Sequence, residues 1–294
     1  MTSSRQSDTP FFFVGQDTHI GYERLVNEDA FGWFNTSNGE LFIVADGLGG
    51  QAGGGVASRL AVSAFHEYVA GHIGEPDDLL RGGVLAADAA VSNAVLDYPE
   101  LTGLGSTLVA MLLQKTEAWY IHVGDSRLYL SSAEGLQLLT RDHTRAQELV
   151  DVGRLTPDKA AKSPERQALT QFLGGEVKVD KLQVGRRSYR ADDTFLLCTD
   201  GLSTLVTDER IQGVLALPAS PQDRARKLIE AALEETGGAD NITVEVVAFK
   251  PGPEAEVLPP VPNYSRRGRV RAFLSGLVVG LLLGCGLAWL WLNY

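Results

Sequence analysis

Phe42-Ile43-Val44-Ala45-Asp46-Gly47 is an apolar run that leads into an aspartate, and the arrangement recurs along the chain. Residues 119–124 lead into Asp125 and residues 195–199 into Asp200, whereas Asp240 precedes the apolar run 242–247. Such runs predict buried strands, which fix the positions of the residues at their ends. In antiparallel neighbours, the C-terminal end of one strand lies beside the N-terminal end of the next. We therefore expect all these aspartates to gather at one rim of a β-sheet core.

A cation is the expected consequence of such a rim. Taken singly, Asp46-Gly47 or Asp240-Asn241 is an ordinary turn-forming dipeptide. Taken together, the carboxylates would repel one another unless a positive charge neutralised them. Sites built from oxygen ligands alone suit magnesium, manganese or calcium. The pattern therefore predicts a site for a hard divalent cation.

The bulk composition is that of a folded protein. With 294 residues, 44% hydrophobic and 21% charged, the chain can hold one large domain or two small ones. A net charge of −11 argues against nucleic acid as a partner, and we interpret the acidic surface as a source of solubility. Cys198 and Cys285 form no disulfide framework, which favours a reducing compartment.

Residues 11–250 read as one domain after a polar, flexible N-terminus at 1–10. Strand-like runs lie in hairpin-like clusters at residues 41–45, 106–113, 118–123, 127–130, 194–198 and 242–249. Helical periodicity occupies residues 56–69, 79–96 and 222–235. Clustered strands and paired helices predict an α+β fold with segregated layers. The polar, proline-interrupted residues 144–175 predict a surface excursion of short helices, a candidate flap.

The composition changes after residue 250. Residues 251–271 form a proline-rich and then arginine-rich linker, and residues 272–292 contain no charged side chain. That length suits one transmembrane helix, and the upstream arginines predict that the main domain lies on the cytoplasmic side of the inner or plasma membrane. The alternative, a buried C-terminal helix of a soluble domain, is disfavoured because soluble helices keep one polar face.

Gly276, Gly280 and Gly284 recur at every fourth position of this segment. Such spacing lets two membrane helices approach closely, so we expect a weak homodimer. Glycine is also frequent in spanning helices generally, which leaves the alternative that the spacing has no role.

Upstream of the first aspartate run stands Arg24-Leu25-Val26-Asn27-Glu28-Asp29, which places a guanidinium a few residues from two carboxylates. An arginine beside a metal rim suits bidentate capture of a phosphate. With this element, seven motifs occur in order. They are Arg24-x-x-x-Glu28-Asp29, Ala45-Asp46-Gly47-x-Gly49-Gly50, Gly105-Ser106-Thr107, Val123-Gly124-Asp125-Ser126-Arg127, Thr140-Arg141-Asp142-His143-Thr144, Thr199-Asp200-Gly201-Leu202 and Asp240-Asn241-Ile242-Thr243. Over residues 14–249 the chain resembles the bacterial form of the type 2C metal-dependent serine/threonine protein phosphatases.

The resemblance implies a four-layer α/β/β/α sandwich of two antiparallel β-sheets flanked by helices. It also implies two divalent cations, Mn²⁺ or Mg²⁺, at one rim of the sheets, and a third that is bound more weakly. By this resemblance, Asp46 bridges the two paired cations, the Gly47 carbonyl binds one of them, and Asp200 and Asp240 bind the other. Asp125 binds the third cation, and Glu28 and Asp29 hold metal-bound waters. Arg24 binds the substrate phosphate. Arg24 and Asp46 are thereby the expected catalytic residues.

The implied reaction is hydrolysis of phosphoserine and phosphothreonine in proteins by direct attack of a metal-bridging hydroxide. The expected partners are phosphorylated proteins, including a serine/threonine kinase or its substrates. Two positions depart from the family pattern, since Leu48 and Gln51 replace histidines found in eukaryotic and bacterial members. Gly55 likewise replaces a glutamate of the bacterial pattern. The proton donor to the leaving group is therefore unassigned, and His143 is expected only to order a turn.

Two other interpretations stay open. The domain could be a non-catalytic phosphoprotein-binding scaffold of the same fold, which the missing histidines favour and the complete acidic set disfavours. It could also be a regulatory phosphatase that acts on an anti-anti-sigma-type protein, which only its substrates would distinguish.

Overall fold

The computed structural model describes residues 11–49, 53–97, 103–175, 177, 181–204 and 206–250. All of them belong to one compact unit. The predicted linker at 251–271 and the predicted spanning segment at 272–292 lie outside the described residues, as do residues 1–10 and Gln51.

Two antiparallel sheets form the centre of this unit. The first has the strand order β1-β11-β10-β7-β8. Its strands are β1 (Phe11–His19), β11 (Ile242–Lys250), β10 (Thr194–Cys198), β7 (Arg127–Ser132) and β8 (Gly135–Leu138). The second has the order β2-β3-β5-β6-β9, with β4 paired to β3. Its strands are β2 (Asp29–Thr36), β3 (Gly39–Leu48), β5 (Leu108–Gln114), β6 (Glu117–Val123), β9 (Gly185–Ser188) and β4 (Gly105–Ser106).

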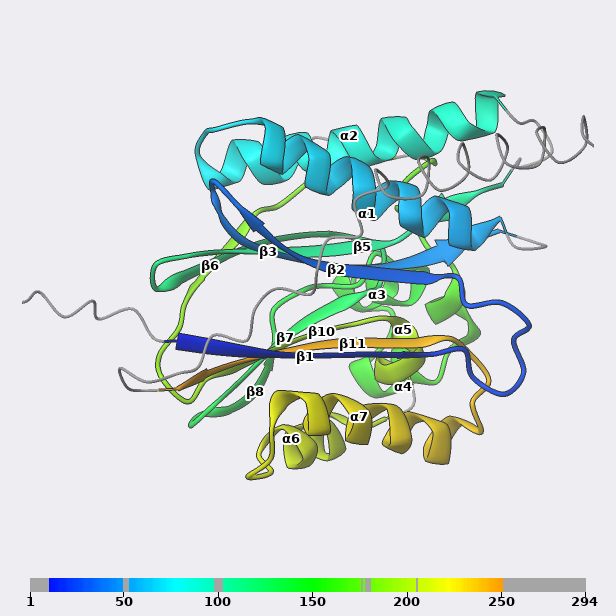
Figure 1. Ribbon diagram of the computed structural model, residues 1–294. Coiled ribbons are helices and arrows are strands. Elements are labelled where there is room, and N and C mark those ends of the chain that lie inside the picture. Colours follow the sequence, from blue (N-terminus) through cyan, green and yellow to red (C-terminus); the bar gives the residue numbers. More distant parts are fainter. Residues whose placement is uncertain are drawn as a thin grey trace, which may run out of the picture. The chain divides into compact units, whose positions relative to one another are not determined.

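Both faces of each sheet are covered, which produces four layers. In β3, Leu41 and Ile43 pack in one buried cluster with α1 (Gly54–Gly71) and α2 (Pro76–Asp97), whereas Phe42 and Val44 pack in another against the opposite sheet. A third cluster joins the first sheet to α6 (Asp208–Leu215) and α7 (Pro221–Thr236). Figure 1 shows the resulting order of helices, sheet, sheet and helices. The expected α/β/β/α sandwich is confirmed for the described residues.

The strand runs read from the sequence coincide with β3, β4 to β7, β10 and β11, and the helical runs with α1, α2 and α7. Helix α7 shows why its bounds were readable. Ser220 accepts a hydrogen bond from the Asp223 N–H, Pro221 occupies the first turn, and Gly237 ends the helix in the left-handed conformation. Strands β1, β2, β8 and β9 were not predicted as strands.

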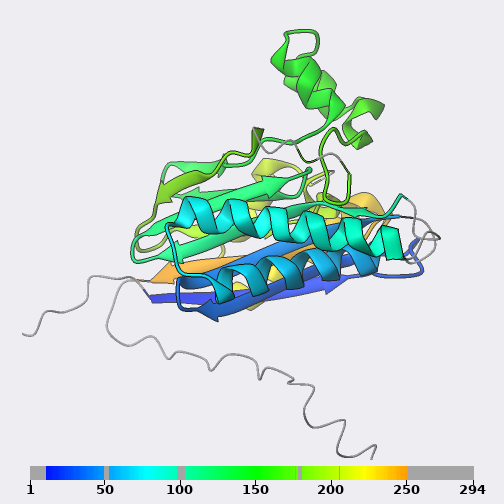
Figure 2. The same ribbon diagram turned by 90° about the horizontal axis from the view of Figure 1, so that it is seen from above.

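The excursion predicted at residues 144–175 is present as short helices. They are α3 (Arg145–Asp151), α4 (Pro157–Ala161) and the 3₁₀ turn η2 (Pro164–Gln167). Figure 2 shows α3 and its neighbours standing away from the sandwich. Thr144 begins α3 by accepting a hydrogen bond from the Gln147 N–H at 3.2 Å. We refer to residues 144–167 as the flap.

Among the described residues, only α2 is long and apolar enough to cross a membrane by length and composition. Its Leu80, Val84, Ala87 and Val91 are buried in the cluster beneath α1 and α2, so α2 is a core helix of the sandwich. The described part of the chain therefore leaves the expected membrane span at residues 272–292 untested.

One charged residue lies inside the apolar layer between the sheets. Glu245 on β11 is fully buried, shares its face of the strand with Val247 and Phe249, and accepts a hydrogen bond from the Gln16 side chain. Its second carboxylate oxygen, Oε2, has no hydrogen-bond partner. Burial raises the pKa of Glu245 well above 4.5, against the lowering effect of the Gln16 hydrogen bond. The folded state therefore favours the protonated acid.

This raised pKa predicts a pH-dependent stability. Above pH 4.5 the unfolded chain loses the Glu245 proton while the folded chain keeps it, so the free energy of unfolding falls as the pH rises towards the folded pKa. Glu245→Gln removes this dependence. Its stability relative to wild type should increase between about pH 5.5 and about pH 8 by on the order of 1 kcal/mol or more, measured by urea denaturation in chelator. Glu230→Gln, an exposed change on α7, is the control and should show no such trend. A constant difference between wild type and Glu245→Gln would contradict the assignment.

Candidate metal centre

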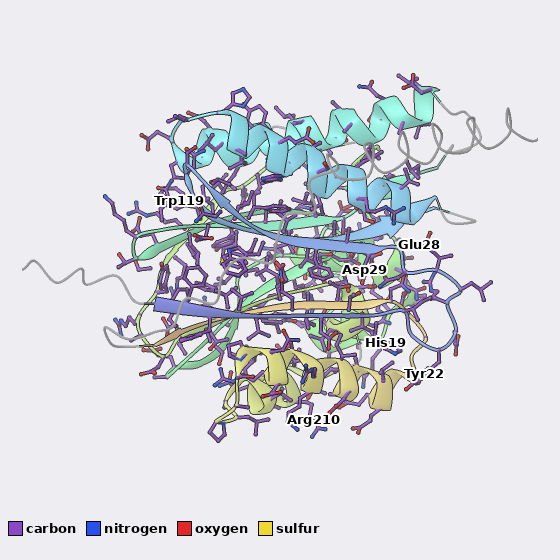
Figure 3. The ribbon with its side chains drawn as sticks, in the orientation of Figure 1. His19, Tyr22, Glu28, Asp29, Trp119 and Arg210 are labelled. Atoms are coloured by element: carbon purple, nitrogen blue, oxygen red, sulfur yellow. The ribbon has the colours of Figure 1, made fainter. Side chains whose placement is uncertain are left out.

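The register of β2 and β3 brings two carboxylates together. Asp29 and Asp46 are direct partners across this antiparallel pair. Asp46 continues the face of β3 that carries Phe42 and Val44, because alternate residues of a strand share a face. Both aspartates therefore point into the layer between the sheets, at the end where that layer opens. Figure 3 shows Asp29 and Glu28 at this end and Trp119 at the other.

The opposite sheet supplies two more aspartates. Strand β10 ends at Cys198, and Asp200 begins the short helix α5 (Asp200–Ser203). Asp240 stands two residues before the start of β11, the antiparallel neighbour of β10. Asp125 occupies the turn between β6 and β7. The sequence-based expectation that strand ends would gather these side chains is thus met geometrically, with the correction that β3 continues through Asp46 to Leu48.

The pKa shifts show how strongly the carboxyls interact. Burial first, and then the charges of Asp29, Asp200 and Asp125, raise the pKa of Asp46 well above its usual value. Burial raises the pKa of Asp29 to about 7. Burial, and then Asp240, raise the pKa of Asp200. These groups cannot all be ionised at neutral pH without a compensating positive charge.

Two observations bear on whether the rim fits a cation. The buried Oδ1 atom of Asp29 has no hydrogen-bond partner, so an acceptor is available there. Among the described residues, however, no three His, Cys, Asp or Glu side chains converge in a preformed coordination arrangement. Because the carboxyls repel one another when ionised, a cation between them would be stabilising. The donor set, all oxygen and anionic, fits a hard divalent cation.

Neutral hydroxyls and amides hold the acidic side chains in place. Thr199 Oγ1 donates to Asp29 Oδ2 at 3.0 Å and accepts from the Thr243 N–H at 3.0 Å, which ties the two sheets together. The Asp46 N–H donates to Thr107 Oγ1 at 2.9 Å, and that hydroxyl bonds Ser126 Oγ at 2.7 Å. The motifs found in the sequence include Thr107, Thr199 and Ser126. Nothing in the sequence, however, predicted that their hydroxyls hold the acidic residues in place.

Asn241 is the junction between β11 and the loop that precedes β2. Its Nδ2 donates to the carbonyls of Ile20 and Val26, at 2.8 and 3.1 Å, and its Oδ1 accepts from the Glu28 N–H at 2.8 Å. The residue is 4% exposed. Its position next to Asp240 was the only sequence signal for this role, and it was read as part of a turn dipeptide.

Arg24 and Glu28 lie beside Asp240. The Arg24 guanidinium contacts both Asp240 carboxylate oxygens, each at 2.9 Å, and lies 4.0 Å from the Glu28 carboxylate. Glu28 Oε1 also accepts from the Gly54 N–H at 3.1 Å, at the start of α1. The Arg24 side chain is 46% exposed, so an incoming anion can reach it.

Gly47 is fixed by close packing. A Cβ at Gly47 would lie 2.0 Å from the Gly54 carbonyl oxygen and 2.6 Å from that of Glu28. Only glycine lets β3 pass so close to the start of α1.

His143 orders the turn that carries Asp125. The imidazole Nδ1 of His143 accepts a hydrogen bond from the Gly124 N–H at 3.1 Å, and the backbone N–H of His143 donates to the Gly124 carbonyl at 2.9 Å. Burial, and then His122, lower its pKa to about 4, so the ring is neutral at pH 7. This agrees with the expectation that it orders a turn. Leu48 occupies the end of β3, and its partner Gly105 belongs to β4.

A groove of about 510 Å³ leads away from the rim beneath the flap. Asp125 and Asp200 lie at its inner end, with Ala146, Val150 and Pro157 on the flap side. Arg127 is not free to bind an anion there, because all three of its guanidinium nitrogens are engaged: two donate to Asp142 at 2.9 and 2.7 Å, and the third donates to the Tyr129 hydroxyl at 2.9 Å. Arg166 donates to the Thr204 carbonyl at 3.1 Å and lowers the pKa of Asp200, against the larger raising effects of burial and Asp240.

Comparisons with known proteins point to one family. A family profile described as protein phosphatase 2C matches residues 16–235. The serine/threonine protein phosphatase PstP of Mycobacterium tuberculosis is 38% identical over 232 residues, which cover 77% of this chain and 43% of that protein. A serine/threonine phosphatase of Listeria welshimeri is 35% identical, over 78% of this chain and 93% of that protein. A solved catalytic domain of PstP, in complex with two manganese ions, superposes with a TM-score of 0.71 at 36% identity and covers 82% of this chain and 99% of its own.

The repulsion at the rim makes a prediction about stability. Asp46→Asn removes one of the interacting charges and keeps an amide that can still bond Asp200. At about pH 8 in chelator, the variant should exceed wild type in free energy of unfolding by on the order of 1 kcal/mol or more. The gain should shrink as the pH falls, because the raised pKa of Asp46 means that acid restores its proton in wild type. A destabilised variant at about pH 8 would show that the carboxyls do not repel one another.

Proposed function

Because this chain belongs to the protein phosphatase 2C family, we propose that it is a metal-dependent protein serine/threonine phosphatase. The chain spans less than half of the mycobacterial relative that it matches, so the proposal concerns the phosphatase domain. Its main support is the set of carboxyls from both sheets whose pKa values are raised by burial and then by one another, at the end of the sandwich where Arg24 is exposed.

We assign the metal ligands as the sequence predicted them. Asp46, the Gly47 carbonyl, Asp200 and Asp240 would hold two divalent cations, Mn²⁺ or Mg²⁺, and Asp125 a third and weaker one. Glu28 and Asp29 would hold water through their carboxylates, and the unpartnered Oδ1 of Asp29 is free to accept such a bond. Two bound cations would supply an activated water for attack on phosphorus and positive charge beside the phosphoryl oxygens.

The chain's own side chains account for the rest of the site. Arg24 would bind the phosphate through its planar guanidinium, which can donate two parallel hydrogen bonds to phosphate oxygens. Asp240 keeps that guanidinium at the rim, and Asn241 keeps the loop that carries it in place. The groove beneath the flap would hold the polypeptide next to the phosphorylated residue, with Arg166 close to its inner end.

A covalent mechanism through cysteine is disfavoured. Cys198, the free cysteine among the described residues, is fully buried, and this burial raises its pKa to about 12. A thiol of that kind is neither accessible nor ionised at neutral pH. Hydrolysis without a phosphocysteine is therefore the proposed course. No described side chain is assigned as the proton donor to the leaving group, since His143 is neutral and its Nδ1 is occupied.

The absence of histidine at Leu48 and Gln51 favours one alternative, a non-catalytic phosphoprotein-binding scaffold. The carboxyl cluster weighs against it, because a scaffold gains nothing from charges that repel without a cation. The proposed substrates are phosphorylated proteins, including a serine/threonine kinase or its targets.

Metal dependence of phosphate release tests the proposal. The chain should dephosphorylate a phosphothreonine peptide with added Mn²⁺ and lose that activity in EDTA. Asp200→Asn should lower kcat/KM by on the order of a hundredfold or more, because a ligand of the reacting centre is lost. Asp223→Asn, at the start of α7, is the matched control and should leave the rate unchanged. Binding of the phosphopeptide with neither phosphate release nor binding of a divalent cation would favour the scaffold. Activity that survives both EDTA and Asp200→Asn would refute the metal mechanism.

We also propose that residues 272–292 anchor the protein in the inner or plasma membrane with the phosphatase domain in the cytoplasm, joined through a linker at 251–271. Support comes from the charge-free sequence and the arginines before it. An anchor would raise the effective concentration of the enzyme near membrane-bound kinases. Self-association through Gly276, Gly280 and Gly284 belongs to the same proposal.

Cell fractionation tests the anchor. The full chain should sediment with membranes and resist carbonate extraction, whereas a chain stopped after Lys250 should stay in the supernatant. Gly280→Ile should lower crosslinked dimer in the membrane fraction without releasing the protein, because a large side chain keeps the helices apart. A full chain recovered in the supernatant would refute the anchor. An unchanged crosslinking pattern in Gly280→Ile would refute only the dimer.

A further inference from the structure

The loop between β1 and β2 exposes apolar side chains on both sides of Arg24 in the sequence. Leu25 is 95% exposed, Tyr22 70% and Val26 42%. We call Tyr22, Leu25 and Val26 the apolar ledge. Leu25 and Val26 belong to the motif that supplies Arg24, Glu28 and Asp29, yet neither has a part in binding metal or phosphate. Their exposure therefore needs another explanation.

The ledge is held rigidly by backbone bonds. The N–H groups of Tyr22 and Glu23 donate to the Gly238 carbonyl at 2.6 and 3.2 Å. Asn241 holds the carbonyl of Val26. Gly21 adopts a φ of +82°, and a Cβ there would lie 2.3 Å from the Asp240 carbonyl oxygen, so the loop packs directly on the segment that carries Asp240. The backbone on both sides of Leu25 is thus hydrogen-bonded in a position that leaves the Leu25 side chain in solvent.

The ledge adjoins the acidic rim. Arg24, next to Leu25 in the chain, contacts Asp240 at 2.9 Å, and Glu28 follows three residues after Leu25. Figure 3 places Tyr22 and His19 at the same end of the sandwich as Glu28 and Asp29. Other strongly exposed apolar side chains of the described residues, Ile73, Leu96 and Val152, belong to other segments of the chain. Ile73 lies in the turn between α1 and α2, far along the chain from every rim residue.

We propose that the apolar ledge is a docking site for the substrate, which binds an apolar side chain close to the phosphorylated serine or threonine. The inference rests on the proposed phosphatase function. The occupant follows from Arg24, because a phosphate held there brings its own polypeptide across the neighbouring Leu25. One residue of extended chain spans about 3.3 Å, so the apolar side chain lies within about two positions of the phosphorylated residue. Leu25 thus sets sequence preference, and Arg24 and the carboxylates act on the phosphate.

The experiment compares peptides with a substrate that is too small to reach the ledge. Phosphothreonine peptides are made with one leucine at each position from two before to two after the phosphothreonine, each beside its serine counterpart. Wild type with Mn²⁺ should show a lower KM for leucine than for serine at one of these positions. Leu25→Ser should raise the KM for that peptide about tenfold at unchanged kcat, because burial of a leucine acts equally on bound substrate and transition state. p-Nitrophenyl phosphate should be hydrolysed as by wild type.

Controls and a double-mutant cycle make the outcome decisive. Ile73→Ser removes a leucine-sized side chain that is 88% exposed outside the ledge and should change nothing. Leu25→Met keeps the apolar surface and should restore the wild-type KM. In the serine peptide the effect of Leu25→Ser should disappear, which shows that the two side chains interact. Equal KM values for Leu25→Ser and wild type on every peptide would overturn the ledge while leaving phosphatase activity intact. Loss of p-nitrophenyl phosphate hydrolysis in Leu25→Ser would also overturn it, because the residue would then act on the rim.

Discussion

The pairing of Asp29 with Asp46 across β2 and β3 is the constraint on which the site depends. A shift of β3 by one residue would turn Asp46 away from Asp29, to the other face of the sheet, and would bring Leu41 and Ile43 into the wrong layer. Alternate side chains of β3 pack in two different hydrophobic clusters, and the same alternation directs the two carboxylates towards the end of the layer between the sheets. Asp200 and Asp240 reach that end from the opposite sheet because β10 and β11 are antiparallel neighbours. The charges are thus collected by strand pairing, against their own repulsion.

Uncharged groups maintain this arrangement. Thr199 spans the two sheets through Asp29 and Thr243, and Thr107 links the backbone of Asp46 to Ser126 beside Asp125. Hydroxyls suit this task because each donates and accepts without adding to the negative charge. Asn241 does the same for the loop before β2, with both donor and acceptor ends used. A lysine or arginine in these positions would neutralise the rim and compete with a cation.

Much of this could be read from the sequence, and the reason lies in burial. Strands such as β3 and β10 are covered on both faces, so they appear as continuous apolar runs that end near an aspartate. β2 is only partly buried along its length, and the central residues of β9 are exposed, so neither gives such a signal. The junction at Asn241 depends on residues more than 200 positions away, and no local pattern contains that information. The flap was readable as broken short helices because Pro157 and Pro164 stand at the starts of α4 and η2.

The cost of burying an ionised carboxylate has different consequences at Glu245 and at the rim. Burial raises the pKa of Glu245, Asp29, Asp46 and Asp200, so the folded chain favours the protonated form of these carboxyls. Glu245 is enclosed by the inter-sheet layer, where the Gln16 hydrogen bond to one oxygen offsets only part of the cost of ionising the buried carboxyl and the other oxygen has no partner. The rim aspartates lie where the layer opens, and a divalent cation can reach them. The repulsion among these carboxylates therefore destabilises the fold only without a cation, and relief of this repulsion contributes to the free energy of metal binding. A site of this kind gains metal affinity because its empty state is electrostatically unfavourable, and the apolar layers on either side must be extensive enough to hold the fold together meanwhile.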